Sequence, residues 1–285
     1  KPFALGANEN IDKVLDVLGY LNENNISSQH IWHEALYALA EISDDVIEKI
    51  LDLILESKSD LFINEQWVIS WWLKKNILKL SLEASPKFLN VANFLLDNIK
   101  KQESDFKEPI TAAINSPEGM LAEAILLKIG DEKLSAGQTL PRNENFQLIE
   151  KIISTDNENL ILAKLIVFSR LQYLFAVDPV WAKEKVIPLL DIQEHAATLW
   201  QGYLWNPRIN VDLALALKDR YIKQFESASS LGKAEKYFMQ LLVFCYLEFP
   251  NLFSDEEVSE LFSGISIKQL EFIASFIESH FKENK

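Results

Sequence analysis

Apolar residues recur at helical spacing along nearly the whole chain. The first such segment places five of them on one stripe, namely Ile11, Val14, Leu15, Leu18 and Leu21. Almost no segment alternates apolar and polar residues as a half-buried strand does. The pattern predicts helices over 8–23, 28–42, 44–57, 61–82, 86–101, 109–115, 117–129, 143–154, 158–176, 179–190, 192–205, 207–226, 233–249, 254–263 and 266–282.

Several of these helices carry a recognisable start signal. A capping residue followed by proline is found at Ser85-Pro86, Ser116-Pro117, Asp178-Pro179 and Asn206-Pro207. The cap accepts hydrogen bonds from free N–H groups of the first turn, where proline has no N–H to leave unpaired. Capping boxes are predicted at Thr155 with Glu158, Ser254 with Glu257, and Ser266 with Gln269.

The least regular stretch lies near the middle of the chain. Gly130 is expected to end the helix over 117–129, and residues 131–142 then read as a loop containing Gly137 and Pro141. We therefore expect a helical-repeat half over 1–130, a loop over 131–142 and a second helical-repeat half over 143–285, together forming one continuous domain. Because the chain begins at Lys1, we expect it to be a fragment of a longer protein. Pro188 should kink or end its helix.

Serial helices with short connections predict an all-α fold. Short connections make successive helices antiparallel neighbours, which suits an irregular α-solenoid of HEAT-like helical hairpins. No strict sequence period supports a regular tetratricopeptide or ankyrin array. An irregular multi-helix bundle is the alternative fold.

Composition narrows the classes of partner. The formal net charge of −14, from 42 acidic and 28 basic side chains, argues against nucleic acid, because binding depends on Lys and Arg displacing counterions from phosphate. No apolar stretch approaches the length of a membrane span, and no signal-peptide pattern opens the chain, so a cytoplasmic protein is expected. The single Cys245, in an apolar run, predicts an inert core thiol.

Residues that could carry chemistry are sparse. His30 and His33 have i, i+3 spacing but lack the His-Glu-x-x-His order of zinc proteases, so no metal is expected. No nucleophile elbow, phosphate loop or dinucleotide turn is present, and we expect neither a cofactor nor an enzyme. The alternative is a helical hydrolase or ligand-binding protein whose site combines scattered carboxylates with His195.

Aromatic residues are the candidates for interaction. Trp67 and Trp71 are i, i+4 neighbours on one predicted helix, whereas Trp72 points about 100° away from Trp71. The second group is the corner Trp200 to Arg208, which contains Trp200, Tyr203, Trp205 and Arg208. Interface anchors are enriched in Trp, Tyr and Arg, although core packing and an interhelix corner explain the same residues.

Two stretches resemble a known family. The segment Ala113 to Ala124, with its Asn-x-Pro-x-Gly corner, and the corner Trp200 to Arg208 resemble the helical C-terminal region found behind sirtuin-like domains in large bacterial anti-phage proteins. The resemblance covers residues 100–225. It implies an NAD-consuming parent protein in which this chain senses, inhibits or assembles, although no NADase residue can be transferred onto it.

From the resemblance and the aromatic residues together we expect a non-catalytic protein-interaction, sensor or regulatory region. The implied partner is a phage protein or a sirtuin-like domain of the parent. An oligomerisation scaffold that binds further copies of itself is the alternative. Neither nucleic acid nor membrane is expected as a partner.

Overall fold

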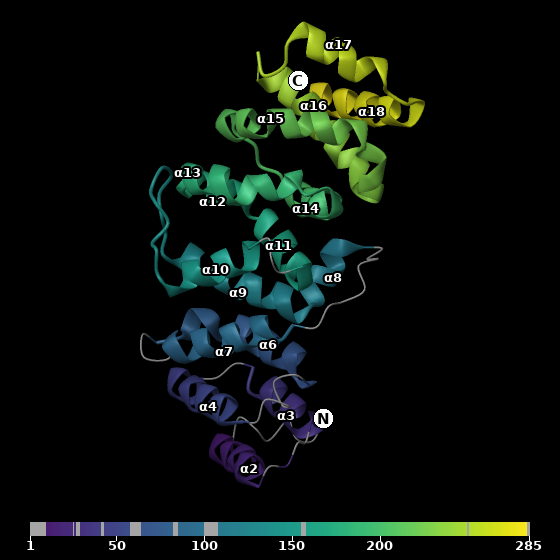
Figure 1. Ribbon diagram of the computed structural model, residues 1–285. Helices are drawn as coiled ribbons and strands as arrows, with labels where there is room; N and C mark the ends of the chain where they lie inside the picture. Colours follow the sequence, from purple (N-terminus) through teal and green to yellow (C-terminus); the bar gives the residue numbers. More distant parts are fainter. Residues whose placement is uncertain are drawn as a thin grey trace. The chain divides into compact units, whose positions relative to one another are not determined.

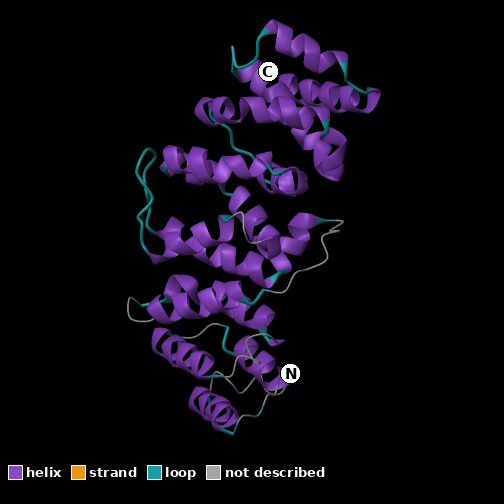
Figure 2. Ribbon diagram, in the orientation of Figure 1, coloured by secondary structure: helices purple, strands orange, loops and turns teal. Residues whose placement is uncertain are grey.

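The computed structural model describes residues 10–24, 26, 29–40, 43–57, 64–81, 85–99, 108–154, 158–249 and 251–283. Every regular element within these ranges is a helix, and none is a strand (Figures 1 and 2). The predicted all-α fold is therefore confirmed. None of the described helices is long and apolar enough to cross a membrane.

The chain divides into two compact units, Lys1–Val167 and Phe168–Lys285. The elements of unit 1 are α2 (Ile11–Glu23), α3 (Gln29–Ala38), α4 (Asp44–Glu56), α6 (Gln66–Asn76), the 3₁₀-helix η1 (Ile77–Lys79), α7 (Ser85–Asp97), α8 (Pro109–Asn115), α9 (Pro117–Asp131), α10 (Glu144–Ile153), the 3₁₀-helix η2 (Glu158–Leu160) and α11 (Ile161–Phe168), which ends at the boundary.

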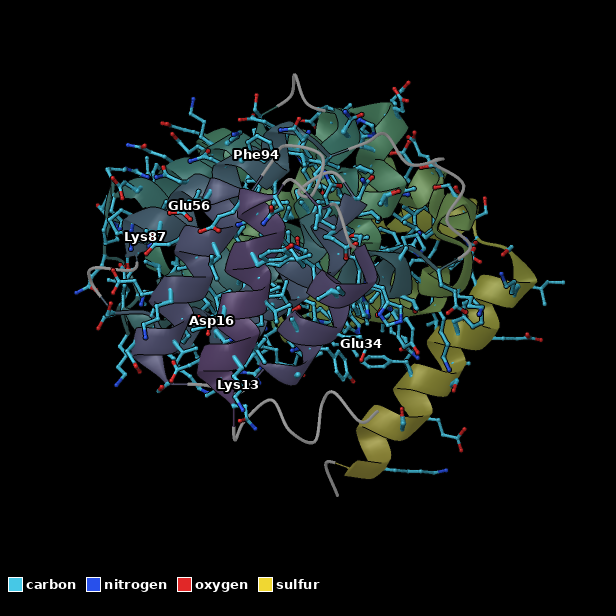
Figure 3. All side chains as sticks on the ribbon, turned by 90° about the horizontal axis from the view of Figure 1, so that it is seen from below. Lys13, Asp16, Glu34, Glu56, Lys87 and Phe94 are labelled. Atoms are coloured by element: carbon cyan, nitrogen blue, oxygen red, sulfur yellow. The ribbon has the colours of Figure 1, made fainter. Side chains whose placement is uncertain are left out.

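The helices of unit 1 form two rows. In one row α3 contacts α6 and α6 contacts α9, and in the other α4 contacts α7 and α7 contacts α10 (Figure 1). Helix α2 packs on α4, and its charged residues Lys13 and Asp16 lie on its outer side (Figure 3). Alternate helices of the chain therefore belong to different rows, as expected where helical hairpins stack.

Neighbouring helices within a row run parallel. His33 of α3 contacts Trp67 of α6, and one turn later Tyr37 contacts Trp71. From α6 to the α8–α9 segment, Trp67 reaches Asn115 and Lys74 reaches Glu123. Both helices of each pair thus advance in the same direction, so side chains at matching positions meet in succession along the row.

Charged contacts tie together the second row. Lys87 of α7 pairs with Glu48 at 2.8 Å and with Asp52 at 2.7 Å, both on α4. Lys151 of α10 pairs with Asp97 of α7 at 2.7 Å. These pairs are partly exposed and contribute little each, because solvent screens them. The buried stripes of these helices therefore supply most of the stability.

Unit 2 combines short 3₁₀ and π segments with the two longest described helices of the chain, α15 (Val211–Glu226) and α18 (Ile267–Glu283). Its elements in chain order are α12 (Leu171–Val177), α13 (Pro179–Trp181), the π-helix η3 (Ala182–Val186), the 3₁₀-helix η4 (Ile187–Asp191), α14 (Gln193–Leu204), α15, the 3₁₀ segment η5 (Ala228–Ala234), α16 (Glu235–Glu248), α17 (Asp255–Ser263) and α18. Helix α14 packs on η4 and η5, and α16 packs on η5 and α18.

Several predicted helix starts are confirmed. Ser116 accepts a hydrogen bond from Gly119 N, and Asp178 accepts one from Trp181 N. Ser254 and Glu257 form a reciprocal capping box. Ser266 and Gln269 also bond reciprocally, through Ser266 N to Gln269 Oε1 and Gln269 N to Ser266 Oγ. The box predicted from Thr155 lies outside the described residues.

Other boundaries were predicted wrongly. Asn206-Pro207 does not start a helix, because α15 begins at Val211 and Asn210 is its cap, accepting from Leu213 N at 2.8 Å. Gly130 lies inside α9, which continues to Asp131. Ser85 is helical, and its hydroxyl donates to Ser81 O.

Two long predicted helices are broken. The segment over 158–176 contains η2, α11 and α12, and that over 179–190 passes from α13 through a π-helix to the 3₁₀-helix that contains Pro188. Hydrophobic periodicity continues through such irregular turns, because a 3₁₀ or π turn changes the rotation per residue only modestly from that of an α-helix. Pro188 was expected to kink or end its helix, and it lies in the first turn of η4, where the π-helix changes to a 3₁₀-helix that continues to Asp191.

The loop predicted over 131–142 lies inside unit 1. The elements on either side of it, α9 and α10, pack against each other. The boundary between the compact units falls between residues 167 and 168 of the sequence. The predicted halves, 1–130 and 143–285, have different bounds. A long connection between two packed helices resembles a boundary in sequence, because turn residues look alike in both settings.

Candidate interaction surface

Four aromatic rings gather on the α3–α6 face of unit 1. They belong to His33, Tyr37, Trp67 and Trp71, which we call the aromatic surface. Neighbouring ring centroids lie 5.0 to 6.5 Å apart, and neighbouring planes differ by 5° to 17°. Tyr37 is 56% exposed and Trp67 is 39% exposed. Two helices thus present nearly parallel rings to solvent.

Local sequence and packing both produce this arrangement. His33 and Tyr37 are i, i+4 neighbours on α3, and Trp67 and Trp71 have the same spacing on α6. Residues so spaced lie one above the other on a helix face. Because α3 and α6 run parallel, His33 meets Trp67 and Tyr37 meets Trp71. Each helix therefore contributes two rings to the patch.

Hydrogen bonds to backbone carbonyls hold the tryptophans of α6. Trp67 Nε1 donates to Asn115 O at 2.9 Å, which ties the aromatic surface to the α8–α9 corner. Trp72 Nε1 donates to Leu39 O at 2.8 Å, and its side chain is fully buried. Of the three tryptophans predicted as interaction candidates on this helix, Trp67 and Trp71 therefore contribute to the surface and Trp72 belongs to the core.

The corner beneath Trp67 is tightly built. Ser116 Oγ caps α9 and donates to Ala113 O at 3.1 Å. A Cβ on Gly119 would lie 1.9 Å from the same carbonyl oxygen of Ala113. Only glycine fits there, so the Asn-x-Pro-x-Gly pattern is explained by the close approach of α8 to the first turn of α9.

The same turn buries a carboxyl group. Glu118 is 1% exposed, and its Oε2 has no hydrogen-bond partner. Burial raises the pKa of Glu118 to about 7, against the opposing effect of hydrogen bonds from its own backbone N–H and from Ser116. The first turn of α9 therefore holds a buried acid whose pKa lies near neutral pH.

The second predicted group is split by the structure. Trp200 and Tyr203 are buried in unit 2, where the Trp200 ring packs on Tyr203, Tyr221 and Phe238. The hydroxyls of Tyr203 and Tyr221 lie 3.2 Å apart. These residues form the core of unit 2 and are not available to a partner.

The remaining members of that group are exposed. Trp205 is 54% exposed at the end of α14, and Arg208 lies in the following exposed turn. No ring or ion-pair contact joins them in the described part of the chain, and the aromatic residues before them are buried. A single exposed tryptophan is ordinary on a protein surface.

Residues considered for chemistry are dispersed. The ring of His33 stacks with Tyr37 and Trp67, and within the described ranges no group of three His, Cys, Asp or Glu residues is placed to hold a metal ion. His195 is half-buried in the first turn of α14. Cys245 is buried, and burial raises its thiol pKa to about 12, so it is protonated at neutral pH.

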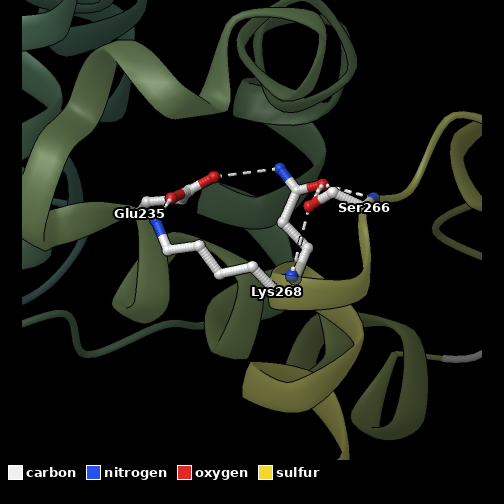
Figure 4. Close-up of polar contacts among 4 residues, drawn as sticks. Glu235, Ser266 and Lys268 are labelled. Carbon is white, nitrogen blue, oxygen red and sulfur yellow. Dashed lines mark hydrogen bonds and ion pairs between the residues drawn. The ribbon is translucent and has the colours of Figure 1, made fainter.

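One polar cluster lies between α16 and α18. The buried carboxylate of Glu235 accepts from Lys268 Nζ at 2.5 Å and from Gln269 Nε2 at 3.1 Å, and Gln269 in turn caps Ser266 (Figure 4). All its polar contacts are internal to unit 2. The cluster therefore fastens the start of α18 to the start of α16.

Sequence reasoning missed two members of the aromatic surface. His33 was considered only with His30 as a metal pair, and Tyr37 was not singled out. Their i, i+4 spacing, repeated by Trp67 and Trp71, was the available signal. The spacing alone does not predict a shared surface, because it does not show that α3 and α6 are parallel neighbours.

The corners that carry the resemblance to sirtuin-associated helical regions now have structures. Ala113 to Ala124 forms the tight α8–α9 turn, whereas Trp200 to Arg208 forms the end of α14 and an exposed turn. Both are structural corners, so the resemblance stays a prediction. Comparison of the chain with protein-family models, with curated proteins and with solved structures found no match.

Proposed function

We propose that this chain is a non-catalytic helical scaffold that binds a protein partner through the aromatic surface. The observation that carries the proposal is the exposure of Tyr37 and Trp67 within a patch of four nearly parallel rings. Large aromatic side chains left together in solvent cost free energy that a partner recovers by covering them. Tyr and Trp are also the residues that dominate interface energetics.

Preorganisation supports the same proposal. The rings project from packed helices, and the Trp67 indole is fixed by its hydrogen bond to Asn115 O. Little side-chain entropy remains to be lost on binding, which favours affinity. A surface of this kind suits sensing or assembly better than chemistry.

We further propose that the hairpins of unit 1 form a HEAT-like α-solenoid. The two rows α3–α6–α9 and α4–α7–α10 support this interpretation, since stacked hairpins place alternate helices in separate layers. The aromatic surface then lies on the outer face of one layer. Extended faces of this kind are what solenoids use to bind proteins.

The resemblance supplies candidate partners for this proposal. They are a sirtuin-like domain of an NAD-consuming parent protein and a phage protein that triggers it, in the cytoplasm of a bacterium. The chain would then act as the sensing or inhibitory region of an anti-phage protein. This assignment depends on the resemblance alone, whereas the binding surface depends on the residues described above.

Direct binding tests the proposal. The purified chain is titrated by biolayer interferometry against purified sirtuin-like domains and phage proteins, with Trp67→Ala and Trp71→Ala as variants and Trp205→Ala as the matched exposed control in unit 2. We expect a partner whose affinity falls at least about tenfold in the first two variants and is unchanged in the control.

Two results would overturn the proposal. One is a partner that binds all variants with wild-type affinity, because the aromatic surface would then be uninvolved. The other is catalytic turnover by the purified chain. Self-association that is lost in Trp71→Ala, measured by light scattering, would identify the partner as a second copy and support the scaffold alternative.

A further inference from the structure

The aromatic surface lies in the more acidic of the two units. Unit 1 contains 26 acidic and 16 basic residues, a formal net charge of −10, whereas unit 2 contains 16 and 12, a net charge of −4. A field of this sign attracts cationic segments and repels the phosphates of nucleic acid. Among the planar groups that stack on aromatic rings, the negative charge therefore favours cationic side chains over the bases of nucleic acid.

An acidic residue borders the surface directly. Glu34 (labelled in Figure 3) lies on α3, one residue after His33 and three before Tyr37. Its i, i+3 spacing makes it a neighbour of Tyr37 on the helix surface. Its carboxylate has no hydrogen-bond or ion-pair partner in the described part of the chain. On α6, Lys74 is paired with Glu123 at 2.5 Å, and Lys75 is exposed one turn beyond Trp71. The acidic side of the surface is thus the α3 side.

The geometry of the rings distinguishes one kind of cation. The four rings already stack with nearly parallel planes, and the arginine guanidinium is the planar, weakly hydrated cation that extends such a stack. A lysine ammonium is a compact and strongly hydrated point charge. Tryptophan is the best aromatic partner of a cation, and two of the four rings are indoles.

We propose that the aromatic surface binds an arginine-bearing segment of the partner protein, with guanidinium groups stacked on Trp67 and Trp71 and attracted by Glu34. This inference rests on the proposed function, because it names the chemistry of the partner at the same surface. A neutral proline-rich segment is the competing occupant, since it also docks on aromatic rings. The local charge favours arginine.

The test compares peptides of equal charge on the full chain. A fluorescent peptide of alternating arginine and glycine is titrated by anisotropy alongside the corresponding lysine peptide and a neutral proline-rich peptide of the same length. We expect the arginine peptide to bind about threefold or more tightly than the lysine peptide, and the proline-rich peptide to bind more weakly than both.

Variants show where the preference arises. Trp71→Leu and Tyr37→Leu should each abolish the preference for arginine over lysine, Glu34→Gln should weaken both charged peptides, and Trp205→Leu should change nothing. Tyr37 is more than half exposed, so its variant is informative even if Trp71→Leu disturbs folding.

Three results would overturn the inference. They are equal affinity for the arginine and lysine peptides, a preference for arginine that survives both Trp71→Leu and Tyr37→Leu, and tighter binding of the proline-rich peptide. Each leaves the proposed function standing if a protein partner still loses affinity in Trp67→Ala and Trp71→Ala. Conversely, a partner that binds Trp67→Ala and Trp71→Ala with wild-type affinity would overturn the proposed function without deciding the peptide preference.

Discussion

At the scale of single residues, the corner between α8 and α9 shows how sequence becomes geometry. Ser116 caps the helix, Pro117 occupies its first position, and Gly119 admits the carbonyl of Ala113. Together these three residues shape the tight turn from α8 into α9. Because Trp67 bonds to Asn115 in the same corner, the position of the aromatic surface depends on it.

Gly119→Ala should destabilise the protein by about 3 kcal/mol. The new Cβ would lie 1.9 Å from Ala113 O, a backbone atom that cannot rotate away, so the corner must open. The matched control is Gly130→Ala in the same helix, where nothing lies within 4 Å of the added atom and alanine is the better helix former. Urea unfolding measures both, and equal stability of the two variants would contradict the prediction.

Glu118 should make stability depend on pH. Its pKa is about 7 when folded and 4.5 as the unperturbed value, so the folded chain holds a proton that the unfolded chain releases between these values. The free energy of unfolding therefore falls as pH rises from 4.5 to 7, by roughly 3 kcal/mol from this group, and is flat for it above that window.

Glu118→Gln tests this dependence. The amide cannot ionise, so the variant should be more stable than wild type at about pH 8 and close to it at about pH 4.5. Urea unfolding at the two pH values gives the difference. An exposed control, Glu271→Gln, should behave as the wild type does at both, and a Glu118→Gln variant that parallels the wild type at both would refute the assignment.

At the scale of elements, helix ends depend on local chemistry and helix partners on packing. Capping pairs at Ser254 and Ser266 could be predicted, because donor and acceptor are three residues apart. The start of α15 could not, since both Asn206 and Asn210 are competent caps. The chain uses Asn210, which leaves Asn206 and Pro207 in the exposed turn after α14.

Ser254→Ala should loosen α17 specifically. This helix has no buried residue, so its first turn depends on the box formed by Ser254 and Glu257. Loss of the cap should cost about 1 kcal/mol of local stability. Hydrogen exchange of the α17 amides should accelerate roughly fivefold, whereas Ser263→Ala at the other end should change them little.

Glu257 adds a second contact at that turn. Hydrogen bonds from Lys218 and from the backbone of Ser254 lower its pKa, so its carboxylate is ionised at neutral pH. Lys218 reaches it from α15 at 2.8 Å. If the α17 amides of the Ser254→Ala variant exchange at the wild-type rates, the contact with Lys218, and not the cap, stabilises the turn.

At the scale of the whole molecule, the two compact units divide the properties of the chain. Unit 1 carries most of the net negative charge and the aromatic surface, whereas unit 2 uses its aromatic residues Trp200, Tyr203 and Tyr221 as core. The same residue types thus serve recognition in one unit and packing in the other. Counting tryptophans does not separate these roles, because exposure depends on which helices cover them.

The sequence by itself determined the all-α class, the position of most helices and several of their caps. Those properties depend on interactions within three or four residues, which periodicity and capping patterns record directly. It also narrowed the interaction candidates to two aromatic groups. The breaks within the helices over 158–176 and 179–190 escaped detection, because periodicity tolerates a π or 3₁₀ turn.

Only the tertiary structure decided which candidates form a surface. Trp67 and Trp71 meet His33 and Tyr37 because α3 and α6 run parallel, and Trp72 is buried with its indole N–H bonded to Leu39 O. It also revealed that Glu118 is buried and that Gly119 faces a carbonyl. The contacts between α3 and α6 join segments far apart in the chain, and local sequence patterns contain no information about which helices will become neighbours.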